Sequence, residues 1–345
     1  MRFFLAQPPV GKFILLLSII MVATSIILPR RYNLDFPRNP GPALDAKVRR
    51  NYIDVLVEQE PEIVLMGDST LVLGLDADLL AQQTGKSVYS IGIPGSASAL
   101  WYLILKNNIA ESSYKPKYLL VVFRDTILTA PGYRVHGSYF ELVDEYARRN
   151  EPLFIQNSFV NLMNPLEIAA EKYFPLYVSR TNIRNNIDAH IRYFSPALFG
   201  CDRNCTDYAM GDIFSGADLE PQALVNAVAA AESDLYRPDQ MDFSTQVDQS
   251  YLPEMIRIAK QHNIQIVFVR IKVETVGPRI TNSPAMLNYL DSLTDYLANE
   301  NVPLLDFGSD PRLTHDLFYD SIHLNEQGQV VFTKMVADEL KGILK

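Results

Sequence analysis

Short apolar runs alternate with amphipathic stretches over two parts of the chain, residues 62–126 and 251–345. The apolar runs have the length of buried strands, and the stretches that follow them have the length of helices. The predicted strands are 63–66, 87–93, 118–123, 264–270 and 302–307. The predicted helices are 71–83 (with a loop), 96–108, 286–299, 325–344 and one that begins at Tyr251. Asp76 and Asn325 are predicted N-caps. Strands that alternate with helices are typical of an α/β fold, in which helices cover both faces of a parallel sheet.

The alternation stops after Thr126 and resumes near Tyr251. The segment between them, about 127–245, is rich in helix-forming residue types and lacks the strand rhythm. We therefore predict an insertion of helices and loops over one end of the sheet. If that end is the carboxyl end of the strands, the insertion walls the cleft and affects the choice of substrate.

An apolar segment precedes the predicted domain. Residues 13–28 carry no charge, and as a helix they span about 24 Å, compared with about 30 Å for a hydrocarbon core. Extension back to Val10 lengthens the helix and lets Lys12 reach the headgroups. We favour a transmembrane signal anchor at 13–28, with a short tail at 1–12 and a proline-rich linker at 29–50.

Two other interpretations of this segment stay open. A cleaved signal peptide would use the small residues Ala23, Thr24 and Ser25, although apolar residues continue past them. A buried core helix fits less well because the segment has no polar face. Charge does not settle the orientation, since basic residues stand on both sides: Arg2 and Lys12 before the segment, and Arg30, Arg31, Arg38 and Lys47 after it. Long domains cross a membrane largely regardless of such charges, so export of the domain is compatible with the sequence.

Composition excludes several classes of function. The chain has 31 Lys and Arg against 40 Asp and Glu, a net charge of −9, so we expect no nucleic-acid partner. Two cysteines cannot form a four-cysteine zinc site, and the histidines other than His323 show no metal-ligand spacing. We therefore expect no metal and no cofactor. Cys201 and Cys205 would close a small disulfide ring in an oxidising compartment and would remain thiols in the cytosol.

Reactive side chains follow the ends of the predicted strands. Ser69 comes directly after the first strand, and Asp320 and His323 lie beyond the fifth. Because the carboxyl ends of parallel strands meet at one edge of a sheet, we expect these residues to lie together. A serine hydroxyl becomes a nucleophile when a base takes its proton, a role that fits His323, with Asp320 orienting the imidazole. An ordinary turn with a capping serine explains Ser69 alone, but not the histidine and aspartate at the same rim.

These residues resemble the motifs of the SGNH (GDSL-type) hydrolases. The matching motifs are Gly67-Asp68-Ser69 after the first strand, Gly95 after the second, and Asp320-x-x-His323 near the C-terminus. The resemblance covers about 62–125 and 250–345 and leaves the middle of the chain unmatched.

The resemblance implies a three-layer α/β/α domain of the flavodoxin-like kind at 51–345. It also implies that Ser69 is the nucleophile, His323 the base and Asp320 its orienting partner. The N–H groups of Ser69 and Gly95 would form part of the oxyanion hole. Together with the apolar segment, the domain resembles bacterial extracytoplasmic SGNH-like proteins that are membrane-anchored and move acyl groups on cell-surface polymers.

One family motif is altered. It usually reads Gly-x-Asn-Asp, whose asparagine donates to the oxyanion, whereas the matching stretch here is Val122-Phe123-Arg124-Asp125. We favour a guanidinium that turns into the cleft, where Arg124 would donate to the oxyanion or bind an anionic substrate group. The alternative is that it pairs with a carboxylate at the rim. Arg270 and Lys272 follow the fourth strand and would bind substrate or form ion pairs there.

These observations together predict acyl-ester chemistry through an acyl-Ser69 intermediate. Water as the acceptor makes an esterase, and a glycan hydroxyl makes an O-acyltransferase. The expected partners are an acyl-ester donor or a glycan substrate, the membrane through the N-terminal helix, and a membrane acyl-transfer protein. The competing hypothesis is a catalytically inactive binding or scaffold protein of an envelope polysaccharide assembly, because the asparagine is missing.

Overall fold

The computed structural model describes residues 9–45, 47–213, 232–276 and 280–344. The described chain divides into two compact units, one within Met1–Pro42 and Leu162–Glu220 and the other within Ala43–Asn161 and Pro221–Lys345. The second unit contains the sheet and all of the predicted site residues.

Five parallel strands form the sheet of the second unit in the order β2-β1-β3-β4-β5. The strands are β1 (Ile63–Gly67), β2 (Val88–Gly92), β3 (Tyr118–Phe123), β4 (Gln265–Arg270) and β5 (Leu304–Asp306). The central strands β1 and β3 are buried at every position, as the continuous apolar runs predict for a sheet that is covered on both faces. The prediction of a parallel α/β sheet is confirmed, with a shorter fifth strand than expected.

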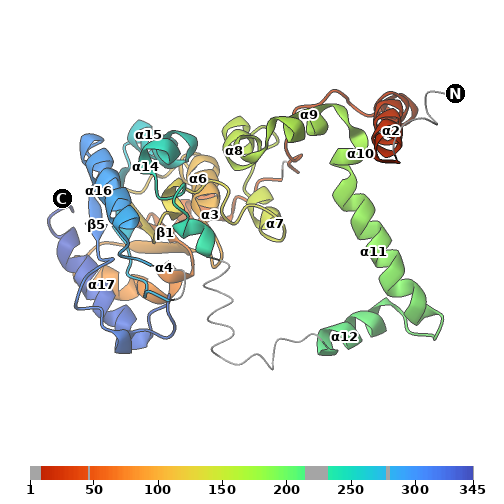
Figure 1. Ribbon diagram of the computed structural model, residues 1–345. Helices are drawn as coiled ribbons and strands as arrows, with labels where there is room; N and C mark the ends of the chain where they lie inside the picture. The colour runs from red at the N-terminus through yellow and green to blue at the C-terminus, as the bar shows by residue number, and fades with distance from the viewer. Residues whose placement is uncertain (1–8, 46, 214–231, 277–279, 345) are drawn as a thin grey trace. The chain divides into compact units, whose positions relative to one another are not determined.

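Helices cover both faces of this sheet (Figure 1). On one face α5 packs against α17, and their apolar side chains form one core cluster with alternate residues of the strands. On the other face α15 packs against β4 and against the helix formed by α6 and its π-helical continuation. The elements are α3 (Asn51–Gln59), α4 (Ser69–Gly74), α5 (Ala77–Thr84), α6 (Ser98–Ile104), η1 (Leu105–Ile109), α15 (Leu252–Gln261), α16 (Pro284–Asn299) and α17 (Glu326–Leu340). This is the expected three-layer α/β/α arrangement.

The two predicted N-caps are present. The side chain of Asp76 accepts hydrogen bonds from the N–H groups of Asp78 and Leu79 at the start of α5. Asn325 accepts from the N–H of Gly328 at the start of α17. Each cap satisfies N–H groups that have no partner within the helix itself, so both helix starts follow directly from the sequence.

The predicted insertion 127–245 does not belong to one unit. Its first part, up to Asn161, and its described last part lie with the sheet, as the short elements η2 (Ile127–Thr129), α7 (Tyr139–Asp144), α8 (Pro152–Ser158), η5 (Ser233–Tyr236) and α14 (Phe243–Gln246). Residues from Leu162 belong to the other unit, and 214–231 lie outside the described residues. The break in the strand rhythm did not predict this division.

The first unit is built from helices. It contains α2 (Pro9–Tyr32), α9 (Pro165–Tyr173), α10 (Pro175–Val178), α11 (Arg180–Ala197) and α12 (Arg203–Ile213), and a disulfide joins Cys201 to Cys205. Helix α2 has 24 residues and a mean hydropathy of 2.3 over its most apolar window, so it is long and apolar enough to cross a membrane. It extends the predicted segment 13–28 at both ends, and residues 1–8 of the predicted tail lie outside the described residues.

Candidate active site

Ser69 is the first residue of α4, immediately beyond the carboxyl end of β1. Asp68 caps this short helix, since its Oδ1 accepts hydrogen bonds from the N–H of Thr70 at 2.8 Å and from the hydroxyl of Thr70 at 2.7 Å. The N–H of a first helical residue has no partner within its own helix. Ser69 therefore offers its side-chain hydroxyl at the rim of the sheet and, beside it, its own backbone N–H as a hydrogen-bond donor.

The turn before Ser69 requires a glycine. A Cβ atom on Gly67 would lie 2.8 Å from the Cβ of Leu71 and 2.9 Å from the carbonyl oxygen of Val122. The second of these is backbone of the neighbouring strand β3, which cannot move aside without disturbing the sheet. The glycine of the Gly67-Asp68-Ser69 motif thus allows α4 to start close against the sheet.

Asp320 and His323 lie in a loop between β5 and α17. The loop is closed by an isolated antiparallel bridge between Phe318 and Leu324, and the N–H of Tyr319 donates to the carbonyl of His323 at 2.8 Å. These bonds hold both side chains on one turn, as the three-residue spacing predicted. The loop brings them to the carboxyl edge of the sheet, where Ser69 lies.

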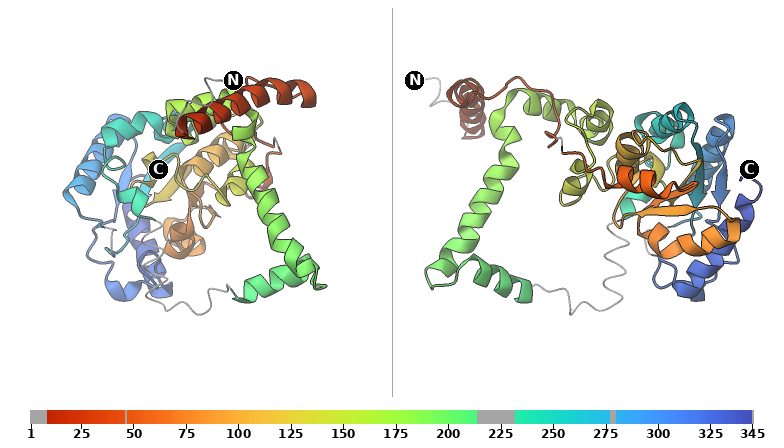
Figure 2. Two further views of the ribbon diagram at one scale, coloured as in Figure 1. Left: turned by 45° about the vertical axis from the view of Figure 1, so that its right-hand side comes forward. Right: turned by 180° about the vertical axis from the view of Figure 1, so that it is seen from behind.

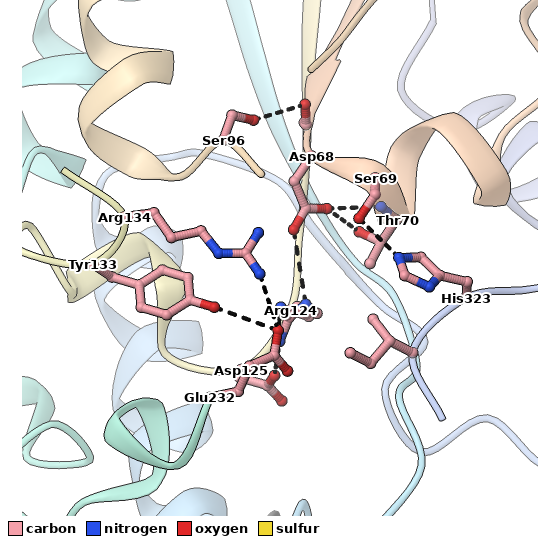
Figure 3. Close-up of polar contacts among 12 residues, drawn as sticks. Asp68, Ser69, Thr70, Ser96, Arg124, Asp125, Tyr133, Arg134, Glu232 and His323 are labelled. Carbon is pink, nitrogen blue, oxygen red and sulfur yellow. Dashed lines mark hydrogen bonds and ion pairs between the residues drawn. The ribbon is translucent and has the colours of Figure 1, made fainter. Parts of the chain in front are cut away.

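A continuous chain of hydrogen bonds joins the three side chains (Figure 3 shows Ser69 and His323). The distance from Ser69 Oγ to His323 Nε2 is 2.8 Å, and the distance from His323 Nδ1 to Asp320 Oδ2 is also 2.8 Å. A carboxylate only accepts, so Nδ1 carries the proton and donates to Asp320. This leaves Nε2 as the acceptor of the Ser69 hydroxyl proton, the arrangement required of a general base.

The Asp320 carboxylate is held in its ionised form. Burial raises its pKa, but hydrogen bonds from the ring of His323 and from the N–H groups of Ile322 and His323 outweigh burial and lower the pKa to about 2. The bonds from these N–H groups to Oδ1 are 2.7 and 2.8 Å long. A charge fixed in this way stabilises the imidazolium that forms when His323 takes a proton.

The loop after β2 is tied to the same turn. The carbonyl of Gly67 accepts hydrogen bonds from the N–H of Ile93 at 3.0 Å and from the hydroxyl of Ser96 at 3.2 Å. Ser96 is in turn held by the indole N–H of Trp101 at 2.8 Å. Gly95 lies within this loop with φ +79°, a conformation that favours glycine. The predicted oxyanion-hole glycine is therefore next to the turn that carries the nucleophile.

The inserted helix α7 reaches the Gly95 loop. A Cβ atom on Gly95 would lie 3.3 Å from Cε1 of Tyr139, the first residue of α7. The guanidinium of Arg134 lies 5.7 Å from the ring centroid of Tyr139 and 5.1 Å from that of Tyr133. This part of the predicted insertion thus contacts the rim of the sheet at the candidate site.

Arg124 is buried within a cluster of carboxylates, and its side chain is 2% exposed. Nη1 donates to Asp125 at 2.9 Å, Nη2 donates to Glu232 at 2.5 Å, and Nε lies 3.8 Å from Oδ2 of Asp68 (Figure 3). Burial lowers the pKa of the guanidinium, but the charges of Glu232, Asp125 and Asp68 raise it well above its ordinary value. Arg124 is therefore a permanent cation that links three acids.

The guanidinium of Arg124 is engaged within the fold and does not take the inward pose that the sequence favoured. Each of its three nitrogens lies within ion-pair distance of a carboxylate, so the residue corresponds to the pairing alternative. Glu232 is a partner that the sequence did not identify. A second cation, Arg134, also contacts Glu232 at 3.2 Å, and the hydroxyl of Tyr133 donates to the same carboxylate at 3.4 Å.

The other two predicted substrate-binding cations are also engaged within the fold. Arg270 is buried and donates to both carboxylate oxygens of Asp306, at 3.1 and 3.2 Å. The two residues are register partners at the ends of β4 and β5. Lys272 donates to the carbonyl groups of Asp310 and Leu313, so it holds the loop after β5. Both side chains are thus engaged by groups of the fold, as the ion-pairing alternative describes for Arg270.

Comparisons with known proteins concern the fold. No family model and no curated protein sequence matches the chain. The chain is similar to the structure of a lipase/acylhydrolase from Enterococcus faecalis, with 12% identity and a TM-score of 0.39, over 82% of this chain and 96% of that one. It is also similar to a GDSL-like lipase from Bacteroides thetaiotaomicron, with 10% identity and a TM-score of 0.35, over 85% of this chain and 98% of that one.

Proposed function

We propose that the protein is a membrane-anchored, SGNH-type serine enzyme that performs acyl-ester chemistry through an ester on Ser69. The observation that carries this proposal is the chain of hydrogen bonds from Ser69 through His323 to Asp320. The glycine turn and the helix start at Ser69 supply the close backbone approach that an acyl-transfer site needs.

In the proposed first step, His323 Nε2 takes the proton of the Ser69 hydroxyl while Oγ attacks the carbonyl carbon of an acyl ester. The negative charge that develops on the carbonyl oxygen is met by the N–H groups of Ser69 and Gly95. The resulting imidazolium, paired with Asp320, gives its proton to the departing alcohol, and the acyl group remains on Ser69.

In the second step the acyl group passes from Ser69 to an acceptor hydroxyl. His323 removes its proton, the acceptor oxygen attacks the acyl carbonyl, and Ser69 regains its proton as the product ester or acid leaves. We propose a hydroxyl of a cell-envelope glycan as acceptor, with water as the hydrolytic alternative. Support for a surface polymer comes from α2, which would tether the site next to the membrane.

Arg124 acts in this account as a positioning residue. Its guanidinium holds Asp68, and Asp68 caps the helix that begins at Ser69. The same guanidinium is held by Glu232, which is 108 positions away in the chain. The nucleophile turn is thus fixed electrostatically to a residue of the insertion.

A direct test of the proposal uses an activated acyl ester such as p-nitrophenyl acetate. The wild-type protein should release p-nitrophenol and carry an acetyl group on Ser69, whereas Ser69→Ala should do neither. Ser244→Ala, at an exposed position of the short helix α14, is the matched control and should behave as wild type. Addition of an envelope glycan should move the acyl group to the glycan if the enzyme is a transferase. Release of free acid at an unchanged rate would identify an esterase.

Localisation is tested separately from the chemistry. We propose that the catalytic unit is extracytoplasmic, with α2 as the anchor. A reporter fused after Lys345 that is active only outside the cytoplasm should be active. A reporter that works only in the cytosol should be silent, and the opposite pair of results would reverse the assignment.

One observation favours a second candidate, a catalytically inactive envelope scaffold. Arg124 stands where the family's asparagine donor is expected, and its guanidinium is engaged by carboxylates, so the proposed oxyanion hole has two backbone donors. Loss of one donor from such a hole costs about 10²–10³ in rate. A slow but measurable acylation of Ser69 supports the enzyme, and complete absence of acylation supports the scaffold.

A further inference from the structure

A row of large apolar side chains is exposed along one side of α11. Ile183, Ile187, Ile191 and Phe194 are 42%, 53%, 70% and 68% exposed. Their spacing of four, four and three residues places them on one face of an α-helix. Exposed apolar side chains occur singly on most proteins, but a continuous row marks a surface that another apolar phase covers.

Further apolar side chains are exposed beyond the end of the helix. Leu198 and Phe199, in the turn that leads to α12, are 67% and 88% exposed, and Tyr208 on α12 is 79% exposed. The disulfide between Cys201 and Cys205 closes the turn between these residues. Exposed apolar side chains thus continue along the chain from α11 through the closed turn into α12.

The remaining faces of α11 are polar and carry more positive than negative charge. Arg192 lies on the side opposite the row, Arg184 borders the row, and the one acid is Asp188, which Arg184 approaches to 4.0 Å. Arg180 stands in line with the row at its start, where it pairs with Glu171 at 3.1 Å. A helix with a row of Ile and Phe, and with arginine at the border of the row and on the opposite side, is the type that lies in a membrane interface, with its apolar face at the acyl boundary. Basic side chains are also attracted to anionic lipid headgroups.

The start of α11 is tied to the end of the candidate membrane helix in the same unit. The chain leaves α2 at Tyr32, and the N–H of Arg38 then donates to the carbonyl of Lys172 at 3.1 Å. Lys172 belongs to α9, and the following helix α10 packs against α2 and leads directly into α11. Figure 2 shows α11 running across the direction of α2 and not alongside it.

We propose that the apolar face of α11, with the turn at Leu198 and Phe199, lies in the membrane–water interface as a second lipid contact besides α2. The proposal rests on the anchoring of the chain by α2, and it is independent of the chemistry at Ser69. A helix that begins near the end of a membrane-spanning helix and runs across it lies parallel to the bilayer surface. In that position the apolar row faces the acyl chains and the arginines reach the headgroups.

The experiment uses the full chain reconstituted in vesicles of phosphatidylcholine and phosphatidylglycerol. An environment-sensitive fluorophore is attached to Ile191→Cys, and to Arg192→Cys as the matched control one residue further along, off the apolar row. The native cysteines are joined in a disulfide and leave the introduced thiol as the reactive one in unreduced protein. Lipids that carry a nitroxide near the headgroup report contact with the membrane, and aqueous iodide reports contact with water.

The proposal predicts a blue-shifted emission and strong nitroxide quenching for the label at position 191, with iodide quenching stronger for the label at position 192. If the chain floats with the vesicles but the two labels show the same emission and the same quenching, α11 does not contact the membrane. That result would overturn the proposal and leave the anchor intact. The label at position 191 could instead be protected from both quenchers and cross-link to a second copy of the chain. The apolar face would then contact protein and not lipid, which would also overturn the proposal. A chain that does not float with the vesicles would refute the anchor and this inference together, whereas acylation of Ser69 is measured separately.

Discussion

His323 and Asp320 are joined by two hydrogen bonds. The ring Nδ1 donates to Oδ2 at 2.8 Å, and the backbone N–H of His323 donates to Oδ1 at 2.8 Å. One residue thus fixes both the position of the loop and the orientation of the imidazole. Asp320 therefore contributes to stability as well as to the proposed chemistry, and the two contributions separate in the experiments below.

Replacement of Asp320 by asparagine should lower kcat for acylation by roughly 10⁴, with a much smaller change in KM, because the imidazole loses its preferred tautomer and its counter-charge. The variant should still fold, since the amide retains the size of the side chain. Steady-state kinetics with the activated ester measure both parameters. A kcat within tenfold of wild type would show that Asp320 does not assist His323.

The same substitution should change how stability depends on pH. The pKa of Asp320 is lowered from 3.8 in the unfolded chain to about 2 in the folded protein, so its ionised form stabilises the fold. This contribution is fully present above the unfolded value and is lost as pH falls from 3.8 towards about 2. At neutral pH the unfolding temperature of the wild type should be higher than that of Asp320→Asn. This difference in unfolding temperature should shrink as the pH falls through the window. A gap that is independent of pH would contradict the lowered pKa.

Loss of Arg124 should destabilise the protein strongly. Arg124→Met leaves the carboxylates of Asp68, Asp125 and Glu232 buried without their central cation, which typically costs about 3–5 kcal/mol. Chemical denaturation should show this loss. If the variant does not fold, Glu232→Gln removes a single charge and serves as the milder test, with a smaller loss of stability.

The control for this cluster is Arg237→Ala. Arg237 and its partner Asp239 are exposed, with side-chain exposures of 58% and 53%, and exposed ion pairs contribute about 0–1 kcal/mol.

Measurements of activity distinguish a role of the cluster in positioning Ser69 from a role in stability alone. Glu232→Gln should lower kcat for Ser69 acylation at a temperature where the variant is folded, because Arg124 then holds Asp68 less firmly. An unchanged kcat in the folded variant would assign the cluster a structural role alone.

Gly67→Ala should impair the turn that carries the nucleophile. The added methyl group would meet the Cβ of Leu71 at 2.8 Å and the Val122 carbonyl oxygen at 2.9 Å, so either α4 or the sheet must shift. We expect a lower unfolding temperature and loss of acylation. Gly342→Ala is the matched control, because its methyl group would approach the nearest atom only to 3.7 Å. Equal behaviour of the two variants would mean that the turn tolerates a side chain.

The cysteines report on the compartment. Cys201 and Cys205 should resist alkylation in protein taken from its native location, and they should react after reduction. The closed loop is short, so its removal by Cys201→Ser should cost only about 2 kcal/mol in the chain-entropy estimate. Mass spectrometry counts the alkylated thiols. Two free thiols in unreduced native protein would place this part of the chain in a reducing compartment.

The fold and the core of the site could be predicted because their signals are local. Each strand is a short apolar run between polar residues, and the caps Asp76 and Asn325 stand directly before their helices. Ser69 directly follows the first predicted strand, and the Asp320-x-x-His323 motif follows the fifth after a loop, so the topology of a parallel sheet brings both to the same edge.

The missed features depend on contacts between distant parts of the chain. Glu232 meets Arg124 across 108 positions, and no periodicity or motif near either residue marks the pair. The division of the insertion between two units was missed for the same reason, because helix-forming composition does not say which core a helix joins. The ends of α2 differ because helix formation continues through Pro29 and the basic residues beyond the apolar segment.

The most direct test of the central claim is covalent labelling of the folded protein with a fluorophosphonate, followed by peptide mass spectrometry. This reagent reacts with a serine hydroxyl that a neighbouring base activates. The account predicts a single adduct on Ser69 in wild type, a much slower adduct in His323→Ala, and no adduct in Ser69→Ala. An unlabelled wild-type protein, or labelling that persists in Ser69→Ala, would contradict a serine enzyme at this site.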